Sequence, residues 1–222
     1  MLCGRYAVDG IVLMSDPRVA AVAVEECGEP LVDCRTRFHV DERRSDPEGH
    51  WAHLRAGVAD RLARAERSLP YDWCWLLVEG YRSPARQREI YDGYAASLRR
   101  LRPEATEAEL ACAAARWVAP SHTAGHVAGA AVDLTVRTRD GTEVDMGCPE
   151  AATPEESAGA CCTAAPDLPA HARRNRDAMI HALRSAGMVN YPTEWWHWSY
   201  GDRYWAFTTR ARSAHYGPAD PP

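Results

Sequence analysis

Residues 194–198, EWWHW, place one carboxylate and one imidazole among three tryptophans, and both polar groups are capable of metal or acid–base chemistry. Glu194 and His197 stand three residues apart, so on a flat strand their side chains would point to opposite faces. A bend or bulge between them would bring both to one site, and we predict a local bend there. Taken alone, the pair favours a buried histidine beside a surface glutamate.

A second segment, SHTAGHVAGAAVDLTV at residues 121–136, contributes His122, His126 and Asp133. Asp133 stands in an apolar, strand-like run, so it either faces solvent or is buried with a partner. Two histidines and one aspartate with a nearby glutamate form the set that a catalytic zinc requires. Three ligands leave a fourth position for water, and a carboxylate that is not a ligand handles the proton.

The third piece is VEGYRSP, residues 78–84, in which Arg82 follows a buried strand and precedes a helix. A guanidinium at that position could stabilise the oxyanion that develops when water attacks a carbonyl. The alternative is a surface arginine that caps a turn.

The elements that must position these residues follow from the apolar pattern. Helices are expected where apolar residues recur at intervals of three and four, over 50–69, 84–101, 104–118 and 170–188. Strands are expected near 31–32 and over 72–80, 130–138, 142–146, 194–201 and 203–207, with a hairpin turn at Asp140-Gly141. Residues 147–169 are expected to form a loop.

Helices first and strands later indicate an α+β fold, a single domain over 1–222 with a central, mostly antiparallel sheet and helices packed around it. Within it, residues 1–30 and 211–222 are expected to be peripheral, and the tail after Arg210 to be loose.

Composition excludes several function classes. The formal net charge of −5 argues against nucleic acid as a partner. No run of 18 apolar residues is present, and the first twenty residues lack the pattern of a signal peptide, so no membrane association and a cytoplasmic location are expected. None of the eight cysteines forms a CxxC pair, which excludes a zinc knuckle and predicts mostly free thiols.

Four short motifs, EGYR, HVAGAAVDLT, DMG and EWWH, occur in the same order and with similar spacing in the D-alanyl-D-alanine dipeptidases, which are zinc metallopeptidases. The chain resembles this family from about residue 31 to 207, and H-x6-D followed by E-x-x-H is the most specific part of the resemblance. The resemblance implies the α+β fold that the D,D-carboxypeptidases and the Hedgehog signalling domain share.

The resemblance also implies roles for five residues. His126, Asp133 and His197 would be the ligands of one Zn²⁺ per chain, Glu194 the catalytic acid and base, and Arg82 the group that stabilises the transition state. The implied substrate is a small D,D-dipeptide, D-alanyl-D-alanine first among them. His122 lacks the seven-residue offset to the aspartate, so it is expected at most to support the ligands without binding the metal.

The tryptophans of EWWHW would keep bulk water from such a site, although core packing is expected for at least two of the three.

Two departures from the resistance-type members of the family concern the substrate. Ala124 stands where those enzymes have a serine that contacts the substrate, and the run MGCPEAATPEES lacks their amine-binding aspartate at its usual offset. Glu150, Glu155 and Glu156 are the carboxylates that could replace it.

Three alternatives stay open from the sequence. The first is a D,D- or L,D-carboxypeptidase that trims cell-wall peptides, the second a non-catalytic zinc-binding module of the same fold, and the third an enzyme acting on a modified amino acid. The same ligands also bind Co²⁺ or Ni²⁺.

Overall fold

The computed structural model describes residues 7–8 and 10–222. Its centre is a five-stranded sheet in the order β4-β6-β7-β9-β8, in which β4 runs parallel to β6 and all other neighbours are antiparallel. The strands are β4 (His39–Val40), β6 (Trp73–Glu79), β7 (Ala131–Thr138), β9 (His197–Ser199) and β8 (Val189–Asn190). Two smaller sheets pair β1 (Ala7–Val8) with β2 (Ile11–Val12), and β3 (Leu31–Asp33) with β5 (His53–Arg55).

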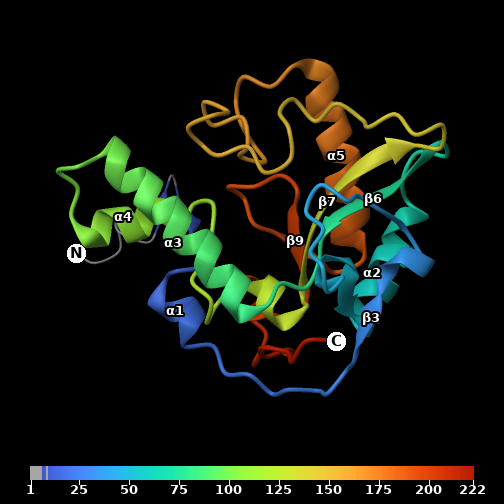
Figure 1. Ribbon diagram of the computed structural model, residues 1–222. Helices are drawn as coiled ribbons and strands as arrows, with labels where there is room; N and C mark the ends of the chain where they lie inside the picture. Colours follow the sequence, from blue (N-terminus) through green and yellow to red (C-terminus); the bar gives the residue numbers. More distant parts are fainter. Residues whose placement is uncertain (1–6, 9) are drawn as a thin grey trace.

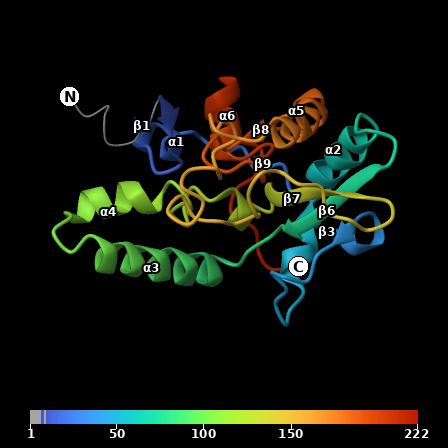
Figure 2. The same ribbon diagram turned by 90° about the horizontal axis from the view of Figure 1, so that it is seen from above.

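The α-helices of the described residues are α1 (Pro17–Ala20), α2 (Ala56–Glu66), α3 (Pro84–Leu101), α4 (Glu107–Ala114), α5 (Ala170–Ser185) and α6 (Arg203–Thr209). Figure 2 shows α2 and α5 side by side over one face of the sheet, while α3 and α4 form a helical hairpin that projects away from it. In the described part of the chain, short 3₁₀ turns lie at η2 (Cys34–Thr36), η3 (His50–Ala52) and η4 (Gly125–Ala128). The fold class is α+β, as predicted (Figure 1).

The main core lies between the sheet and the helices α2 and α5. β6 and β7 are buried over most of their length, which explains their nearly continuous apolar sequences. Val58, Leu62 and Ala65 recur along α2 at helical spacing and face this core. The sheet is therefore a rigid base from which β6, β7 and β9 can present polar side chains at one end.

Several predicted elements are confirmed. α3 covers residues 84–101 as expected, because Ser83 accepts a hydrogen bond from the backbone of Arg86 and Pro84 occupies the first helical position. β7 and α5 also lie within their predicted ranges, and the structure has no helix or strand between residues 147 and 169.

The helix predicted over 50–69 begins later than expected. Its first residues form η3 and then β5, because the backbone of His53–Arg55 pairs with β3 in an antiparallel ladder. The helix predicted over 104–118 is also shorter, since the capping box of Thr106 and Glu109 sets its start. Residues 142–146 form no strand; a single bridge joins Arg137 to Glu143.

The prediction of a second strand at 203–207 is wrong. The segment RYWAF is part of helix α6, because the Asp202 side chain accepts a hydrogen bond from the backbone of Trp205 and caps the helix. A run of five residues that is rich in aromatic side chains does not distinguish a strand from a short helix, and the cap at Asp202 favours the helix.

The prediction of a loose tail is also wrong. Tyr216 is 3% exposed, and the backbone N–H of Ala219 donates to Val127 in η4. Leu13 and Met14 near the other end of the chain are likewise buried. None of the helices in the described part of the chain combines the length and apolar content that a membrane span requires.

Candidate active site

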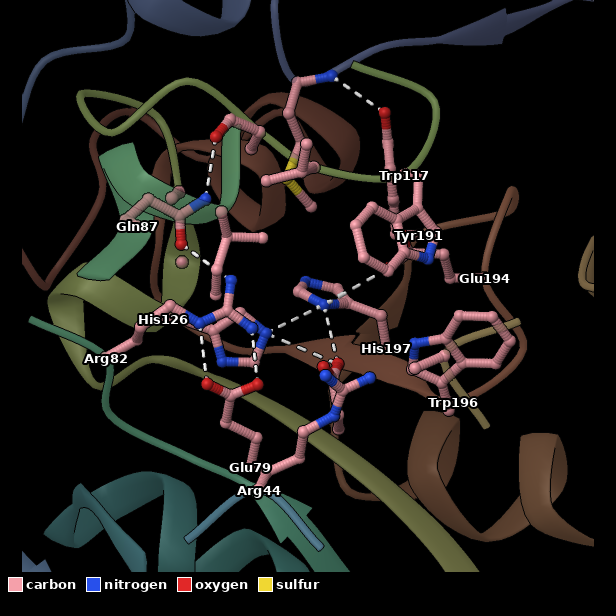
Figure 3. A pocket seen from close by; sticks show the side chains of 18 residues that line it. Arg44, Glu79, Arg82, Gln87, Trp117, His126, Tyr191, Glu194, Trp196 and His197 are labelled. Atoms are coloured by element: carbon pink, nitrogen blue, oxygen red, sulfur yellow. Dashed lines mark hydrogen bonds and ion pairs between the residues drawn. The ribbon is translucent and has the colours of Figure 1, made fainter. Parts of the chain in front are cut away.

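Three side chains converge at one end of the central sheet. His126 comes from η4, Asp133 from β7 and His197 from β9, and each is at most 6% exposed. The Nδ1 atom of His197 lies 2.9 Å from Oδ1 of Asp133 and 3.2 Å from Nε2 of His126. The same Nε2 atom lies 3.3 Å from Oδ1 of Asp133, so the three atoms form a compact triangle. The residues that the sequence singled out as a ligand set are thus brought together (Figure 3).

Strand register positions two of the three. Asp133 and His197 are directly opposite each other in the antiparallel pair β7–β9, so their side chains lie on the same face. His126 reaches them from η4, which ends at Gly129 in the left-handed region with φ of 64°. The backbone of Arg82 donates to the carbonyl of His126 and ties η4 to the end of β6.

A turn brings Glu194 to the same point. The N–H of His197 donates to the carbonyl of Glu194 at 3.3 Å, so residues 194–197 fold back before β9 begins. The side-chain amide of Asn190 holds this turn by donating to the carbonyls of both Glu194 and His197. Oε2 of Glu194 consequently lies 3.7 Å from Nδ1 of His197, and the predicted bend is confirmed.

The donor set fits a divalent metal such as zinc. Nδ1 of His126 lies 2.7 Å from the carbonyl oxygen of Gly80, which can only accept, so this nitrogen carries the proton and Nε2 presents a lone pair. Tetrahedral ligands at zinc distances stand roughly 3.3 Å apart, and the three separations of 2.9–3.3 Å are close to this value. Two imidazoles and one carboxylate leave a fourth position open.

Burial and the neighbouring charges together determine the protonation of these groups. Burial alone would raise the pKa of Asp133, but the two histidines beside it outweigh that effect and hold the pKa well below its usual range. Burial lowers the pKa of His197, despite the opposing effect of Asp133. An ionised carboxylate and neutral imidazoles are the forms that bind a metal.

Glu194 differs from Asp133 in its environment. Burial, followed by the charge of Asp133, raises its pKa well above the usual glutamate value. Two neighbouring carboxylates thus have pKa values displaced in opposite directions, which suits one for holding a cation and the other for exchanging a proton.

Arg82 is fixed on the opposite side of the cavity by a partner that the sequence analysis missed. Its guanidinium donates to both oxygens of Glu79, at 2.7 and 2.5 Å, and to Oε1 of Gln87 at 2.8 Å. Glu79 is opposite Asp133 in the β6–β7 register. Burial would raise the pKa of Glu79, but Arg82 outweighs it and lowers that pKa. The signal in the sequence was the three-residue offset in EGYR, which places both side chains at the end of one strand.

The cavity between these groups is small, with a volume of about 50 Å³. Trp196 lines it, whereas Trp195 and Trp198 pack in the core, as expected for two of the three tryptophans. Tyr191 and Arg44 also line it, and no sequence signal distinguished either residue (Figure 3). The Tyr191 ring lies edge-on to His197, and its hydroxyl donates to the carbonyl of Ala115.

The other candidates lie in different places. His122 is exposed and faces a separate hollow beside Asp202 and Tyr216. Glu155 accepts a hydrogen bond from Tyr94, and the side chain of Glu156 accepts from Thr153. Neither of these two glutamates lines the cavity.

Ala124 does line the cavity, at the position of the family's serine. Glu150 is buried nearby, and burial together with the charge of Asp133 raises its pKa to about 8.

Comparison with known proteins places this site in a family. The family model described as "D-ala-D-ala dipeptidase" matches residues 76–214, a range that contains all five predicted site residues. A D-alanyl-D-alanine dipeptidase from Synechocystis sp. is 28% identical over 225 residues, which cover 86% of this chain and 90% of that protein. A D-alanyl-D-alanine dipeptidase from Escherichia coli is 32% identical over 114 residues, covering 50% of this chain and 53% of that protein.

Among solved structures, the LdcB LD-carboxypeptidase superposes with a TM-score of 0.44 at 19% identity, covering 92% of this chain and 86% of that one. The family model spans more than half of the chain and includes η4, β7, β9 and the last four residues of β6, the elements that converge on the cavity. The chain therefore belongs to the D-ala-D-ala dipeptidase family of metallopeptidases.

Proposed function

We propose that this protein hydrolyses a small dipeptide, with D-alanyl-D-alanine as the first candidate, and that it uses one Zn²⁺ held by His126, Asp133 and His197. The observation that carries the proposal is the convergence of these three buried donors, with Glu194 within 4 Å of one of them. The products would be two molecules of alanine, since water adds across a single peptide bond.

The metal, when bound, would supply a Lewis acid and lower the pKa of a water molecule to about 7. Glu194 would accept the proton from the attacking water and later deliver it to the leaving amine. A pKa raised above the usual glutamate value suits a group that must act first as base and then as acid. The burial of Glu194 supports this role.

Arg82 would stabilise the negative charge that develops on the carbonyl oxygen. Glu79 and Gln87 occupy only part of its donor capacity, because a guanidinium has five N–H groups and three hydrogen bonds are formed to these two side chains. Its position is fixed before the substrate arrives, so no reorganisation is required during the reaction.

The nearby wall residues favour a small substrate. Trp196 and Tyr191 limit the cavity on the side of β9, and Ala124 and Met14 line it as well. Apolar side chains at this wall lower the local dielectric and strengthen the charge interactions beside them.

The test is a substrate panel assayed with added Zn²⁺. It comprises D-Ala-D-Ala, the L,L, L,D and D,D forms of other small dipeptides, and a longer peptide that ends in D-Ala-D-Ala. The proposal predicts release of free alanine from D-Ala-D-Ala and little from the longer peptide. Preference for the longer peptide would identify a carboxypeptidase instead, and no turnover with one equivalent of metal bound would overturn the proposal.

A further inference from the structure

Arg44 occupies an unusual position beside the cavity. It follows β4 in a segment without regular structure, yet it lines the same cavity as His126, Asp133 and Glu194. Its side chain is half-buried and extends toward the histidines in Figure 3. It also lines the two neighbouring grooves, so it stands where they open into the cavity.

The neighbouring arginines have fixed anionic partners. Arg43 forms ion pairs with Asp41 at 2.8 Å and with Glu143 at 2.7 Å, and Arg82 is paired with Glu79. Within residues 7–8 and 10–222, by contrast, the guanidinium of Arg44 forms no ion pair with a carboxylate and no hydrogen bond.

Glu150 interacts electrostatically with Arg44, but among the described residues the two form no ion pair. The charge of Arg44 lowers the pKa of Glu150, but burial and the charge of Asp133 raise it to about 8, so this glutamate is largely uncharged at neutral pH. Removing a cation from water without an anion is costly, and the cost is recovered when a ligand supplies the anion.

The C-terminal carboxylate of a dipeptide is such an anion, and it lies close to the bond that is cleaved. This carboxylate lies one residue beyond the peptide bond that is cleaved, and a guanidinium binds a carboxylate through two parallel hydrogen bonds. We propose that Arg44 binds the free carboxylate of the substrate and thereby selects peptides whose last residue is the leaving residue. This inference rests on the proposed dipeptidase function and adds to it a residue that determines specificity.

The test compares D-Ala-D-Ala with D-Ala-D-alaninamide, which differs only in lacking the terminal charge. Wild type, Arg44→Ala, Arg44→Lys and the control Arg43→Ala are assayed for kcat/KM on both. Arg44→Ala is expected to lower kcat/KM for the acid about 10- to 100-fold and to leave the amide within about threefold, since a charge-assisted bidentate contact is lost. Arg44→Lys should fall between wild type and Arg44→Ala, and Arg43→Ala should behave as wild type.

A binding measurement separates the effect of Arg44 on substrate affinity from any effect on catalysis. In the Glu194→Gln background with metal added, calorimetry should show the acid binding at least tenfold more tightly than the amide, and Arg44→Ala should remove this difference. Equal losses on acid and amide, or no loss on either, would overturn the role of Arg44. Failure of wild type to hydrolyse either compound would instead overturn the proposed function.

Discussion

The carboxylates of Glu194 and Asp133 both lie within 4 Å of Nδ1 of His197, and their different environments suit them to different roles. Two imidazole nitrogens lie within 3.3 Å of Asp133 and its pKa is lowered, whereas the pKa of Glu194 is raised by burial and by Asp133 itself. Asp133 is therefore suited to bind a metal, and Glu194 is suited to move the proton.

Replacement of Glu194 by glutamine tests this division. Glu194→Gln keeps the size of the side chain and removes its ability to take up a proton, so kcat should fall about 10²- to 10⁴-fold. Metal content measured by elemental analysis should remain one equivalent per chain. Loss of the metal in this variant would show that Glu194 is a ligand and that the assignment is reversed.

Arg82 contributes both to catalysis and to stability, and a single variant cannot separate the two contributions. Arg82→Ala should lower kcat about 10²- to 10³-fold, because the oxyanion loses a charged donor. It should also destabilise the fold by about 3 kcal/mol, since Glu79 is left buried without its partner.

The double variant Arg82→Ala/Glu79→Gln separates these effects. It should recover most of the stability, measured by urea unfolding, and none of the turnover. Recovery of turnover together with stability would mean that Arg82 only supports the structure.

Glu150 makes the stability of the protein depend on pH. Burial raises the pKa of this group from about 4.5 in the unfolded chain to about 8, so the folded state holds its proton more tightly. Stability is therefore lost as pH rises through this window, by up to a few kcal/mol. Glu150→Gln should flatten the fall in the unfolding free energy of the metal-free protein between pH 5.5 and 8. The exposed control Glu104→Gln should keep the wild-type dependence, and an unchanged slope in Glu150→Gln would refute the assignment.

At the scale of elements, the position of His126 depends on a left-handed backbone conformation at the end of η4. Gly129 ends this turn with φ of 64°, and a Cβ at that position would overlap Cδ2 of Leu31. Gly129→Ala should therefore destabilise the protein by about 2 kcal/mol or more and weaken metal binding.

Gly93 offers a matched control in the same urea unfolding experiment. It lies within α3, and an added Cβ would contact nothing within 4 Å. Gly93→Ala should stabilise the helix by about 0.5–1 kcal/mol. A neutral effect of Gly129→Ala would show that η4 adapts without cost.

Element prediction succeeded where caps and apolar periodicity agree. Ser83 and Pro84 mark the start of α3, and the apolar run of β7 is long enough to identify a buried strand. Element prediction failed where pairing between distant segments decides the structure. His53–Arg55 continues a helical pattern in the sequence but is a strand in the fold, because β3 offers its backbone a partner.

Across the whole molecule, the site residues that belong to a local sequence pattern were predicted, and those that come from distant segments were missed. The seven-residue offset between His126 and Asp133 and the offset between Glu194 and His197 are local, so sequence and family resemblance identify them. Arg44 comes from a segment about 80 residues before η4 with no local pattern, and only the folded chain brings it to the cavity. The boundaries of the domain and the roles of the site residues stay predictions.

The central claim is metal-dependent hydrolysis of D-alanyl-D-alanine at this site. The most direct measurement is the rate of free D-alanine release by metal-free protein as Zn²⁺ is added from zero to two equivalents per chain. The rate should rise linearly and reach its plateau at one equivalent, with no such rise in His126→Ala. No release of D-alanine at one bound equivalent, or the same titration curve in His126→Ala, would contradict the central claim.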